Sequence, residues 1–475
     1  MKKTIISIIL CAAALITPLA LTAAVAEAIG PQGEDSFFAE LKYKYERLKS
    51  TDSPKVVLIG GSNLAFGINS KLLEEYLGMP VVNFGLYAAL GTKPMLDLAK
   101  GEIKKGDIVV ICPELDSQTY SLYYGGRYML TAIDGTDLLT HVGISNFPTL
   151  LASLPEFASS KVYNLRNNIE PKSEGIYSLS SFDEYGDIRV EREYNTRPDY
   201  GASSPINLSE SLVTEEFTDY LNDYAKSLER RGAKVWFSFP PMNEAAISVS
   251  DEEKAGFYKK LGESLDFPVI SGLDDYILDR EFFYDTNFHL TTKGATQRTL
   301  TLAGDIMREA GMTDKLESFD WSLRLTPPRR PDDYFAGSKS ENDAENSLDF
   351  VFEKTDGGLV VTGLSEAGKT RETLTLPGVA NDLPVVAIGK NAFSGGAAKT
   401  LVIPESSPLG LIESDAFAGS ALERIEARIS AENLSASEES FRGSNCYFYL
   451  KPDLYAEYAV DYIWSGLMKF VKLDA

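Results

Sequence analysis

A short apolar run that ends in two glycines and a serine is the feature that most constrains this chain of 475 residues. Residues 56–59 are four aliphatic residues in succession, and Gly60 and Gly61 follow them directly. Such a run is typical of a central strand in a parallel sheet, because that strand is buried on both faces. The glycines permit a sharp turn and leave room for another group to approach. The turn therefore presents Ser62 and Asn63 at the carboxyl edge of a sheet, where α/β proteins place their ligands.

Apolar runs and amphipathic segments alternate along the chain around this strand. Runs of apolar residues predict further strands, and apolar residues at three- and four-residue steps predict helices. The predicted strands cover residues 80–85, 106–114, 234–241 and 268–270, and the predicted helices cover 36–50, 70–78, 92–103, 213–228, 251–265 and about 291–310. This alternation predicts an α/β fold with a doubly wound parallel sheet.

Ser62 is a candidate nucleophile, and His289 is the candidate base for it. A serine needs a base to take its proton and donors to hold the oxyanion. The chain has only two histidines. His289 follows the last predicted core strand and precedes a helix, whereas His141 is interpreted as an ordinary residue of an insertion. Asp285, four residues before His289, can orient its ring. The alternative is that Ser62 only caps a helix and His289 is structural.

Three sequence blocks within residues 50–312 resemble the SGNH, or GDSL-like, hydrolase superfamily. GGSN at residues 60–63 is similar to the nucleophile block, Asn83-x-Gly85 to the second block, and Asp285 to His289 to the last block. The resemblance implies a flavodoxin-like three-layer α/β/α sandwich and ester hydrolysis or O-acyl transfer, with no metal or organic cofactor. It also implies that the Gly85 N–H is an oxyanion donor.

The combination of blocks resembles the exported branch of that superfamily, which acts on cell-envelope polymers. This branch includes the D-alanine transfer protein of teichoic-acid modification and the alginate acetylation proteins. A membrane O-acyltransferase is the usual partner in this branch, so the resemblance implies such a partner and a cell-surface polysaccharide or acylated glycan as substrate.

The chain departs from the family pattern at two positions. The family has an asparagine after its third strand that donates to the oxyanion, but Pro113 and Glu114 stand there in this chain. An ionised Glu114 would repel an oxyanion, and Asn63 or Asn83 could substitute as donors. The family aspartate is typically three residues before the histidine, where this chain has Thr286.

The C-terminal part of the chain carries an internal repeat. Phe393, Phe417 and Phe441 recur every 24 residues, each followed by x-Gly, and the apolar run of residues 401–404 predicts a strand between the first two. A period of this length with a strand in each unit predicts a short leucine-rich repeat solenoid. The unit also resembles the leucine-rich repeats of bacterial surface proteins, which implies binding. The alternative is a stabilising appendage without a ligand. Residues 449–471 are predicted to form a helical cap.

These features predict an order of domains along the chain. Residues 1–28 combine a charged start, an apolar run and small residues near a cleavage site, so they are a signal peptide or an N-terminal anchor. Residues 35–319 form the hydrolase-like domain, with an insertion or lid over 117–205. Residues 320–345 are a linker rich in proline and charge, and residues 346–475 form the repeat domain.

Composition limits the function further. The net charge is −23, so the basic surface that nucleic acid requires is missing. Cys112 and Cys446 are far apart in the sequence and do not form a disulfide framework.

The first hypothesis for the function is an exported serine esterase or O-acyltransferase that acts on cell-surface glycan. The alternative is an inactive SGNH-like scaffold or adhesion protein whose repeats bind a surface partner.

Overall fold

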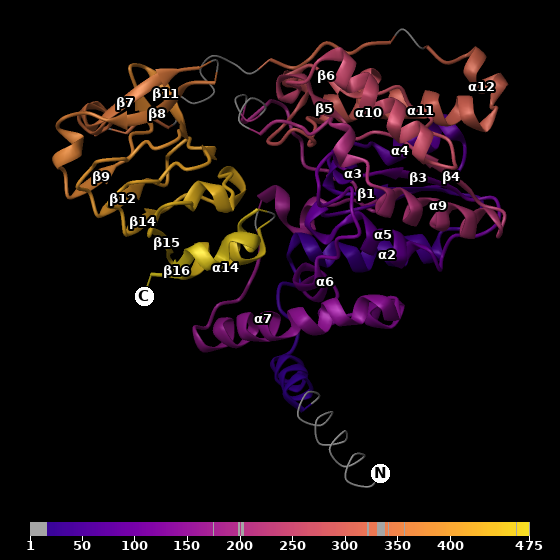
Figure 1. The fold of residues 1–475 in the computed structure, drawn as a ribbon, viewed down its shortest axis with the longest axis horizontal. Helices are drawn as coiled ribbons and strands as arrows, with labels where there is room; N and C mark the ends of the chain where they lie inside the picture. The colour runs from indigo at the N-terminus through magenta and orange to yellow at the C-terminus, as the bar shows by residue number, and fades with distance from the viewer. Residues whose placement is uncertain are drawn as a thin grey trace.

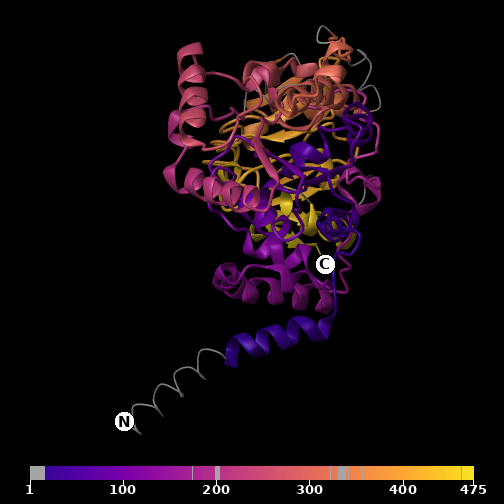
Figure 2. The same cartoon turned by 90° about the vertical axis from the view of Figure 1, so that its right-hand side faces the viewer.

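The computed structural model describes residues 17–474, apart from 174, 198–199, 201–203, 321–322, 330–337, 341, 356 and 462. Figure 1 shows an α/β region built from the first two thirds of the chain beside a C-terminal region rich in strands. Most of the predicted signal peptide or anchor, residues 1–16, lies outside the described residues. Residues 17–29 form a helix, which projects from the α/β region (Figure 2).

A four-stranded parallel sheet is the centre of the α/β region. Its strands are β1 (Val56–Gly60), β2 (Val81–Gly85), β3 (Ile108–Cys112) and β4 (Lys234–Phe237), in the order β2-β1-β3-β4. Gly60 pairs with Gly85 on one side and with Cys112 on the other, so the three strands end at the same level. The α/β prediction with a parallel sheet is therefore confirmed, and β1 is a central strand as the apolar run indicated.

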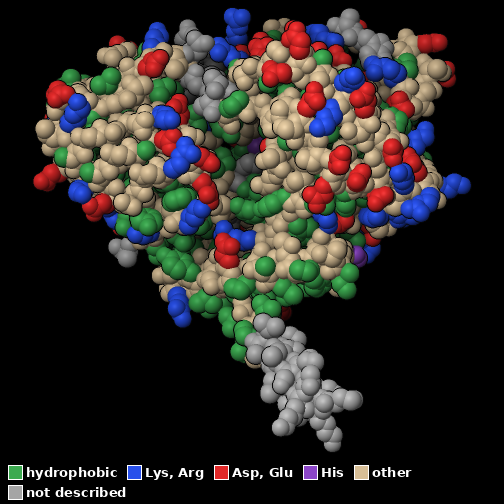
Figure 3. Space-filling view, in the orientation of Figure 1, with side chains coloured by type: hydrophobic (Ala, Val, Ile, Leu, Met, Phe, Trp, Pro, Cys, Tyr) green, Lys and Arg blue, Asp and Glu red, His purple; other side chains and the backbone are tan. Residues whose placement is uncertain are grey.

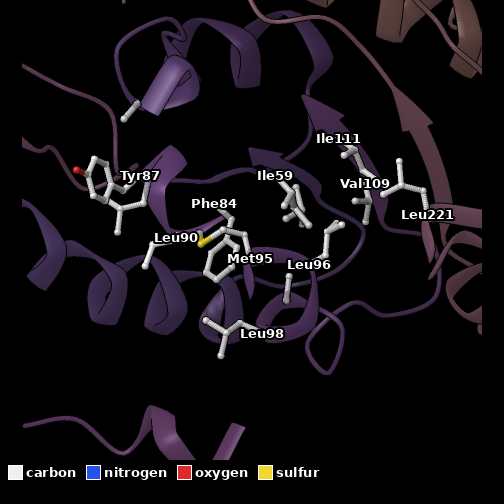
Figure 4. Close-up of a cluster of buried hydrophobic side chains, with 14 of the residues drawn as sticks. Ile59, Phe84, Tyr87, Leu90, Met95, Leu96, Leu98, Val109, Ile111 and Leu221 are labelled. Atoms are coloured by element: carbon white, nitrogen blue, oxygen red, sulfur yellow. The ribbon is translucent and has the colours of Figure 1, made fainter. Parts of the chain in front are cut away.

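Alternate residues of the strands face two separate hydrophobic clusters. Val57 and Ile59 of β1 belong to one cluster, with side chains of the helices around residues 40–50, 92–99 and 215–229. Val56 and Leu58 belong to the other, with side chains of the helices around residues 70–77 and 292–310. Figure 4 shows side chains such as Met95 next to the sheet in the first cluster. Helices thus cover both faces of the sheet and fix its carboxyl edge in place.

The described residues of this region contain the six helices that the alternation predicted and four others. They are α2 (Glu40–Ser50), α3 (Ser62–Ala65), α4 (Ser70–Leu77), α5 (Thr92–Ala99), α6 (Gly126–Ala132), α7 (Phe147–Arg166), α9 (Glu215–Glu229), α10 (Asp251–Ser264), α11 (Thr292–Ala310) and α12 (Thr313–Glu317). Side chains cap several of them, and Thr291 is the N-cap of α11 because its side chain accepts from the Gly294 N–H.

The predicted strand at residues 268–270 is wrong. Val269 forms only a single bridge with Phe237. Pro268 has no N–H to donate to a ladder, which limits this segment to a short contact at the edge of the sheet. A separate pair of short parallel strands, β5 (Met242–Asn243) and β6 (Ile277–Leu278), lies nearby in the chain.

The C-terminal region contains two sheets and its own hydrophobic cluster. One sheet has the order β10-β11-β8-β7, with β13 paired to β11, and the other has the parallel order β16-β15-β14-β12-β9. The elements are α13 (Asp343–Asn346), β7 (Phe350–Lys354), β8 (Leu359–Leu364), β9 (Thr373–Thr375), β10 (Val379–Ala380), β11 (Leu383–Ile388), β12 (Thr400–Ile403), β13 (Leu411–Ile412), β14 (Arg424–Ala427), β15 (Tyr447–Leu450), α14 (Pro452–Val460) and β16 (Val471–Leu473).

The 24-residue period of the sequence is repeated in the structure. The rings of Phe393 and Phe417 lie 5.7 Å apart, and the next pair, Phe417 and Phe441, lies 5.8 Å apart. The glycines that follow them, Gly395 and Gly419, both adopt positive φ, which glycine does without a steric penalty. Successive units therefore stack with their phenylalanines in a continuous column.

The tail differs from the predicted helical cap. Its helix α14 lies between β15 and β16, and these two strands extend the parallel sheet.

The surface is charged over both regions but apolar around α7 (Figure 3). Ile144, Phe147, Leu151 and Leu165, on or next to α7, are exposed, as are Leu21 and Val25 of the N-terminal helix. None of the helices in the described part of the chain is both long and apolar enough to span a membrane.

Candidate active site

Ser62 lies where the sequence predicted it, at the turn between β1 and α3. The two preceding glycines are required by close approaches. A Cβ atom on Gly60 would lie 2.3 Å from the carbonyl oxygen of Cys112, and one on Gly61 would lie 2.7 Å from Oε1 of Glu114. A larger residue at either position would push the turn away from β3, so the glycines allow Ser62 to sit against the end of that strand.

The structure brings the three predicted catalytic side chains into one hydrogen-bonded line. His289 Nε2 lies 2.8 Å from Ser62 Oγ, and His289 Nδ1 lies 2.9 Å from Asp285 Oδ1. These distances lie within the range expected for a nucleophile, its base and the group that orients the base. All three side chains are buried.

The loop that carries Asp285 and His289 explains the unusual spacing between them. The Tyr284 N–H donates to the His289 carbonyl at 2.9 Å, which closes the loop on itself. The Thr286 hydroxyl accepts the His289 N–H at 3.1 Å. Thr286, three residues before His289, thus supports the backbone of the loop. Asp285 reaches the ring from one residue earlier.

Tyr177 and Phe66 hold the imidazole ring and its carboxylate. The Tyr177 hydroxyl donates to Oδ2 of Asp285 and lies 3.1 Å from His289 Nδ1. The ring of Phe66 stacks on His289 with 4.0 Å between centroids and 7° between planes. The imidazole is thus fixed both in its plane and along its hydrogen-bond axis.

Electrostatics favour an ionised Asp285. Burial alone would raise the pKa of its carboxyl, but His289, Arg197 and the hydroxyl of Tyr177 outweigh burial, and the pKa of Asp285 is lowered. An ionised Asp285 stabilises the imidazolium that forms when His289 takes a proton.

The three predicted oxyanion donors are engaged in contacts within the protein. The Asn63 side-chain amide donates to the Cys112 carbonyl at 3.1 Å. The Asn83 amide donates to the Leu64 carbonyl at 2.9 Å, and its Oδ1 accepts the Gly85 N–H at 3.1 Å. Asn83 and Gly85 therefore bind each other in this state of the site.

Glu114 is a second side chain in direct contact with Ser62. Its Oε1 lies 3.1 Å from Ser62 Oγ and accepts the Asn63 N–H at 3.0 Å. Burial raises the pKa of Glu114 and Asp116 raises it further, while His289 and the two hydrogen bonds act in the opposite direction.

Two arginines and a tyrosine shape the site without a signal in the sequence. Arg298 of α11 is fully buried and donates to Asn63 Oδ1 at 3.0 Å, which fixes the residue after the nucleophile. Arg192 donates to the carbonyls of Leu290 at 2.7 Å and Phe66 at 3.2 Å. Arg192 and Tyr177 belong to the insertion, whose irregular sequence has no period that would indicate which residues face inward.

The insertion therefore helps to build the site. Its aromatic segment at residues 123–128, YYGGRY, contributes to packing within the protein. Tyr128 stacks against Phe38 at 5.9 Å and meets Tyr87 edge to face at 5.5 Å. These rings are part of the packing between α6 and the start of the chain.

The C-terminal region reaches the edge of the site through one residue of the insertion. Arg197 donates a hydrogen bond to the hydroxyl of Ser435, and it also lowers the pKa of Asp285. A Cβ atom on Gly410 would lie 3.3 Å from Arg197 Cγ, so this part of the C-terminal region packs directly on the arginine.

His141, the other histidine, contacts the Tyr45 hydroxyl through Nδ1 at 2.9 Å and has a structural place between α2 and the insertion. Cys112 and Cys446 are buried free thiols. Among the described residues, acidic, histidine and cysteine side chains form no cluster of three or more that could hold a metal ion.

The sequence matches no protein-family model and no curated protein.

Proposed function

We propose that this chain is a serine esterase or O-acyltransferase of the SGNH type. The single observation that carries the proposal is the line Ser62–His289–Asp285, in which the nucleophile and base lie 2.8 Å apart and the base and carboxylate 2.9 Å apart. A serine activated in this way attacks acyl carbons.

The reaction proceeds in two halves. Ser62 Oγ attacks the carbonyl carbon of an ester while His289 Nε2 takes the hydroxyl proton, and Asp285 stabilises the imidazolium. The bond to the leaving alkoxy group then breaks, His289 returns the proton to that oxygen, and the acyl group stays on Ser62. Water or a sugar hydroxyl next attacks the acyl-serine, gives its proton to His289, and leaves with the acyl group as Ser62 recovers its proton.

The substrate class follows from the resemblance to envelope-modifying proteins. We infer that the acyl group is small, such as acetyl, and that the alcohol is a cell-surface glycan. The parallel α/β region with helices on both faces supports a flavodoxin-like sandwich. The stacked 24-residue units support a leucine-rich repeat solenoid, whose role would be to bind a partner or polymer near Ser62.

The place of action that we propose is the outer side of a cell membrane. The apolar segment before residue 17 supports export or anchoring. The exposed apolar face of α7, with Phe147 and Leu151, lies on the side from which the N-terminal helix projects. Such a face suits contact with a membrane or with a membrane O-acyltransferase.

The second candidate function is a non-catalytic scaffold. One observation favours it: Asn83 and Gly85, the predicted oxyanion donors, are bound to each other. In that case the repeats would carry the function through a surface partner.

Hydrolysis and transfer assays test the proposal. The purified chain is incubated with p-nitrophenyl acetate, and then with an O-acetylated polysaccharide in the presence and absence of a sugar acceptor. We expect release of p-nitrophenol that Ser62→Ala abolishes, and acetate transfer to the acceptor if the protein is a transferase. A folded wild type that releases no p-nitrophenol and no acetate would support the scaffold instead.

A further inference from the structure

The hydroxyl of Ser62 has one proton, and both His289 and Glu114 lie within hydrogen-bonding distance of it. His289 Nε2 lies 2.8 Å away and Glu114 Oε1 lies 3.1 Å away. An ionised carboxylate only accepts hydrogen bonds. If Glu114 is ionised, Ser62 must give it the proton, and His289 Nε2 must then carry a hydrogen of its own and cannot act as a base.

The opposite arrangement leaves the serine ready to react. If Glu114 is a neutral carboxylic acid, its O–H donates to Ser62 Oγ, and the Ser62 proton points at His289 Nε2. Proton transfer during attack then runs along the 2.8 Å contact. Of the two protonation states of Glu114, only the neutral one is compatible with the proposed mechanism.

We propose that Glu114 acts as a carboxylic acid that donates a hydrogen bond to the oxyanion formed at Ser62, in place of the asparagine of related hydrolases. This inference rests on the proposed function. When Ser62 Oγ bonds to the acyl carbon, the carbonyl oxygen becomes a second oxygen on the same tetrahedral carbon. The Glu114 O–H, already directed at Oγ, turns to that oxygen, and the proton remains on Glu114.

The position of Glu114 fits this role. It follows β3 at the carboxyl edge of the sheet, and its side chain is 4% exposed. The absence of a side chain on Gly61 makes room for the carboxyl group, because a Cβ atom there would lie 2.7 Å from Oε1. The Asn63 N–H, at 3.0 Å, fixes the same oxygen beside the nucleophile.

The groups around Glu114 favour its neutral form. Burial raises its pKa, and Asp116 on the same loop adds to the effect. His289 is the main opposing charge, and Arg298 from α11 and Tyr200 from the insertion also interact with it. A carboxyl group kept neutral by its surroundings is an effective oxyanion donor.

The neutral Glu114 also gives a reason for the contacts of the other expected donors. The Asn83 amide supports the Leu64 carbonyl of α3, and the Gly85 N–H is satisfied by Asn83. Glu114, by contrast, touches the nucleophile itself. The donor that directly faces the reacting oxygen is then the Glu114 acid, which follows β3.

The pH dependence of ester hydrolysis tests this role. We expect kcat/KM of the wild type to fall as the pH rises through the raised pKa of Glu114. Glu114→Gln carries an amide N–H at every pH, so it retains activity and loses that fall. Glu114→Ala removes the donor and lowers kcat by roughly 10²- to 10³-fold. Glu102→Gln is the matched control, because the Glu102 carboxyl also accepts a hydroxyl, that of Tyr45, at 3.0 Å, and its profile should match the wild type.

A fall with pH that persists unchanged in Glu114→Gln, or full activity of Glu114→Ala, would overturn the inference. Infrared difference spectra of the full chain, wild type minus Glu114→Gln, give a second measure that needs no turnover. They report whether the Glu114 carbonyl stretch is that of an acid or of a carboxylate. Hydrolysis at a pH where Glu114 is a carboxylate would defeat this inference alone. A neutral Glu114 in a protein that hydrolyses no ester would defeat the proposed function and leave the protonation state established.

Discussion

The two carboxyl groups near Ser62, Asp285 behind the His289 ring and Glu114 against the serine itself, differ in their pKa shifts. On the base side, His289 and Asp285 form a line with hydrogen-bond distances of 2.8 and 2.9 Å, and the pKa of Asp285 is lowered. On the other side, the buried Glu114 carboxyl group, whose pKa is raised, lies 3.1 Å from Ser62 Oγ. Both carboxyl groups are buried, and burial raises both pKa values. At Asp285 the charge and hydrogen bond of His289, together with Arg197 and Tyr177, outweigh burial. At Glu114 burial remains the larger effect, although His289 opposes it. The surroundings of Asp285 favour the ionised carboxylate, and the surroundings of Glu114 favour the protonated acid.

The largest expected effect comes from removing the base side. On the proposed mechanism, His289→Ala should lower the rate of ester hydrolysis by about 10⁴-fold or more, as in serine enzymes whose base is removed. His141→Ala is the matched control, because this second histidine contacts Tyr45. Steady-state kinetics with an acetyl ester measure both. If the two variants lost activity equally, the assignment of His289 as base would be wrong.

The next effect concerns the tyrosine that supports Asp285. Tyr177→Phe removes a hydroxyl that donates to Oδ2 of the ionised carboxylate. A hydrogen bond to a charged group contributes about 1.5–3 kcal/mol, so kcat should fall by about 10- to 100-fold with little change in KM. Tyr45→Phe, which removes a hydroxyl bonded to Glu102 and His141, should leave kcat unchanged. A Tyr177→Phe variant with wild-type kcat would show that Phe66 and Asp285 suffice to hold the ring.

Stability should respond to pH in opposite directions on the two sides. The folded pKa of Asp285 lies below its ordinary value of 3.8, so its ionised form stabilises the fold above that value, and the contribution is lost as the pH falls through the folded pKa. The folded pKa of Glu114 lies above 4.5, so the fold loses stability as the pH rises from about 4.5 to the folded pKa.

Thermal melts from pH 2 to pH 8 measure this difference. The melting temperature of Glu114→Gln should rise relative to the wild type as the pH increases above about 4.5, whereas the loss in Asp285→Asn should be constant above pH 3.8 and shrink as the pH falls below that value. Parallel curves for the two variants would contradict the contrast between the two carboxyl groups.

The smallest effect tests the link between the C-terminal region and the site. Ser435→Ala removes the hydroxyl that accepts a hydrogen bond from Arg197, and Arg197 in turn lowers the pKa of Asp285. We expect kcat/KM to fall less than about tenfold, because Arg197 acts on Asp285 through its charge, and the substitution leaves that charge in place. Ser365→Ala, in a C-terminal loop where the hydroxyl donates to the Leu348 carbonyl, is the control. An equal loss in both variants would indicate a general effect on the C-terminal region.

The sequence predicted the parts of the molecule that depend on local pattern. The apolar run before Gly60 predicted a central strand, and the position of Ser62 directly after that strand predicted its place at the carboxyl edge of the sheet. The 24-residue period of Phe393, Phe417 and Phe441 predicted the stacking of the C-terminal units. These predictions rest on spacing along the chain, which the fold preserves.

The sequence did not predict the contacts made across the chain by irregular segments. Tyr177 and Arg192 lie in an insertion without a helical or strand period, so nothing marked them as residues of the site. The protonation state of Glu114 depends on burial and on neighbours from distant segments, which spacing does not reveal. The segment at residues 268–270 was apolar enough for a strand, yet Pro268 limits it to a single bridge.

The central claim is that Ser62 is an activated nucleophile, and covalent labelling with a fluorophosphonate probe tests it most directly. Intact-mass and peptide spectrometry of the labelled chain measure how much probe is attached and where. We predict one probe per chain, attached to Ser62, with labelling abolished in Ser62→Ala and strongly reduced in His289→Ala. A folded wild type that takes up no probe, or a probe found on another serine, would contradict the account.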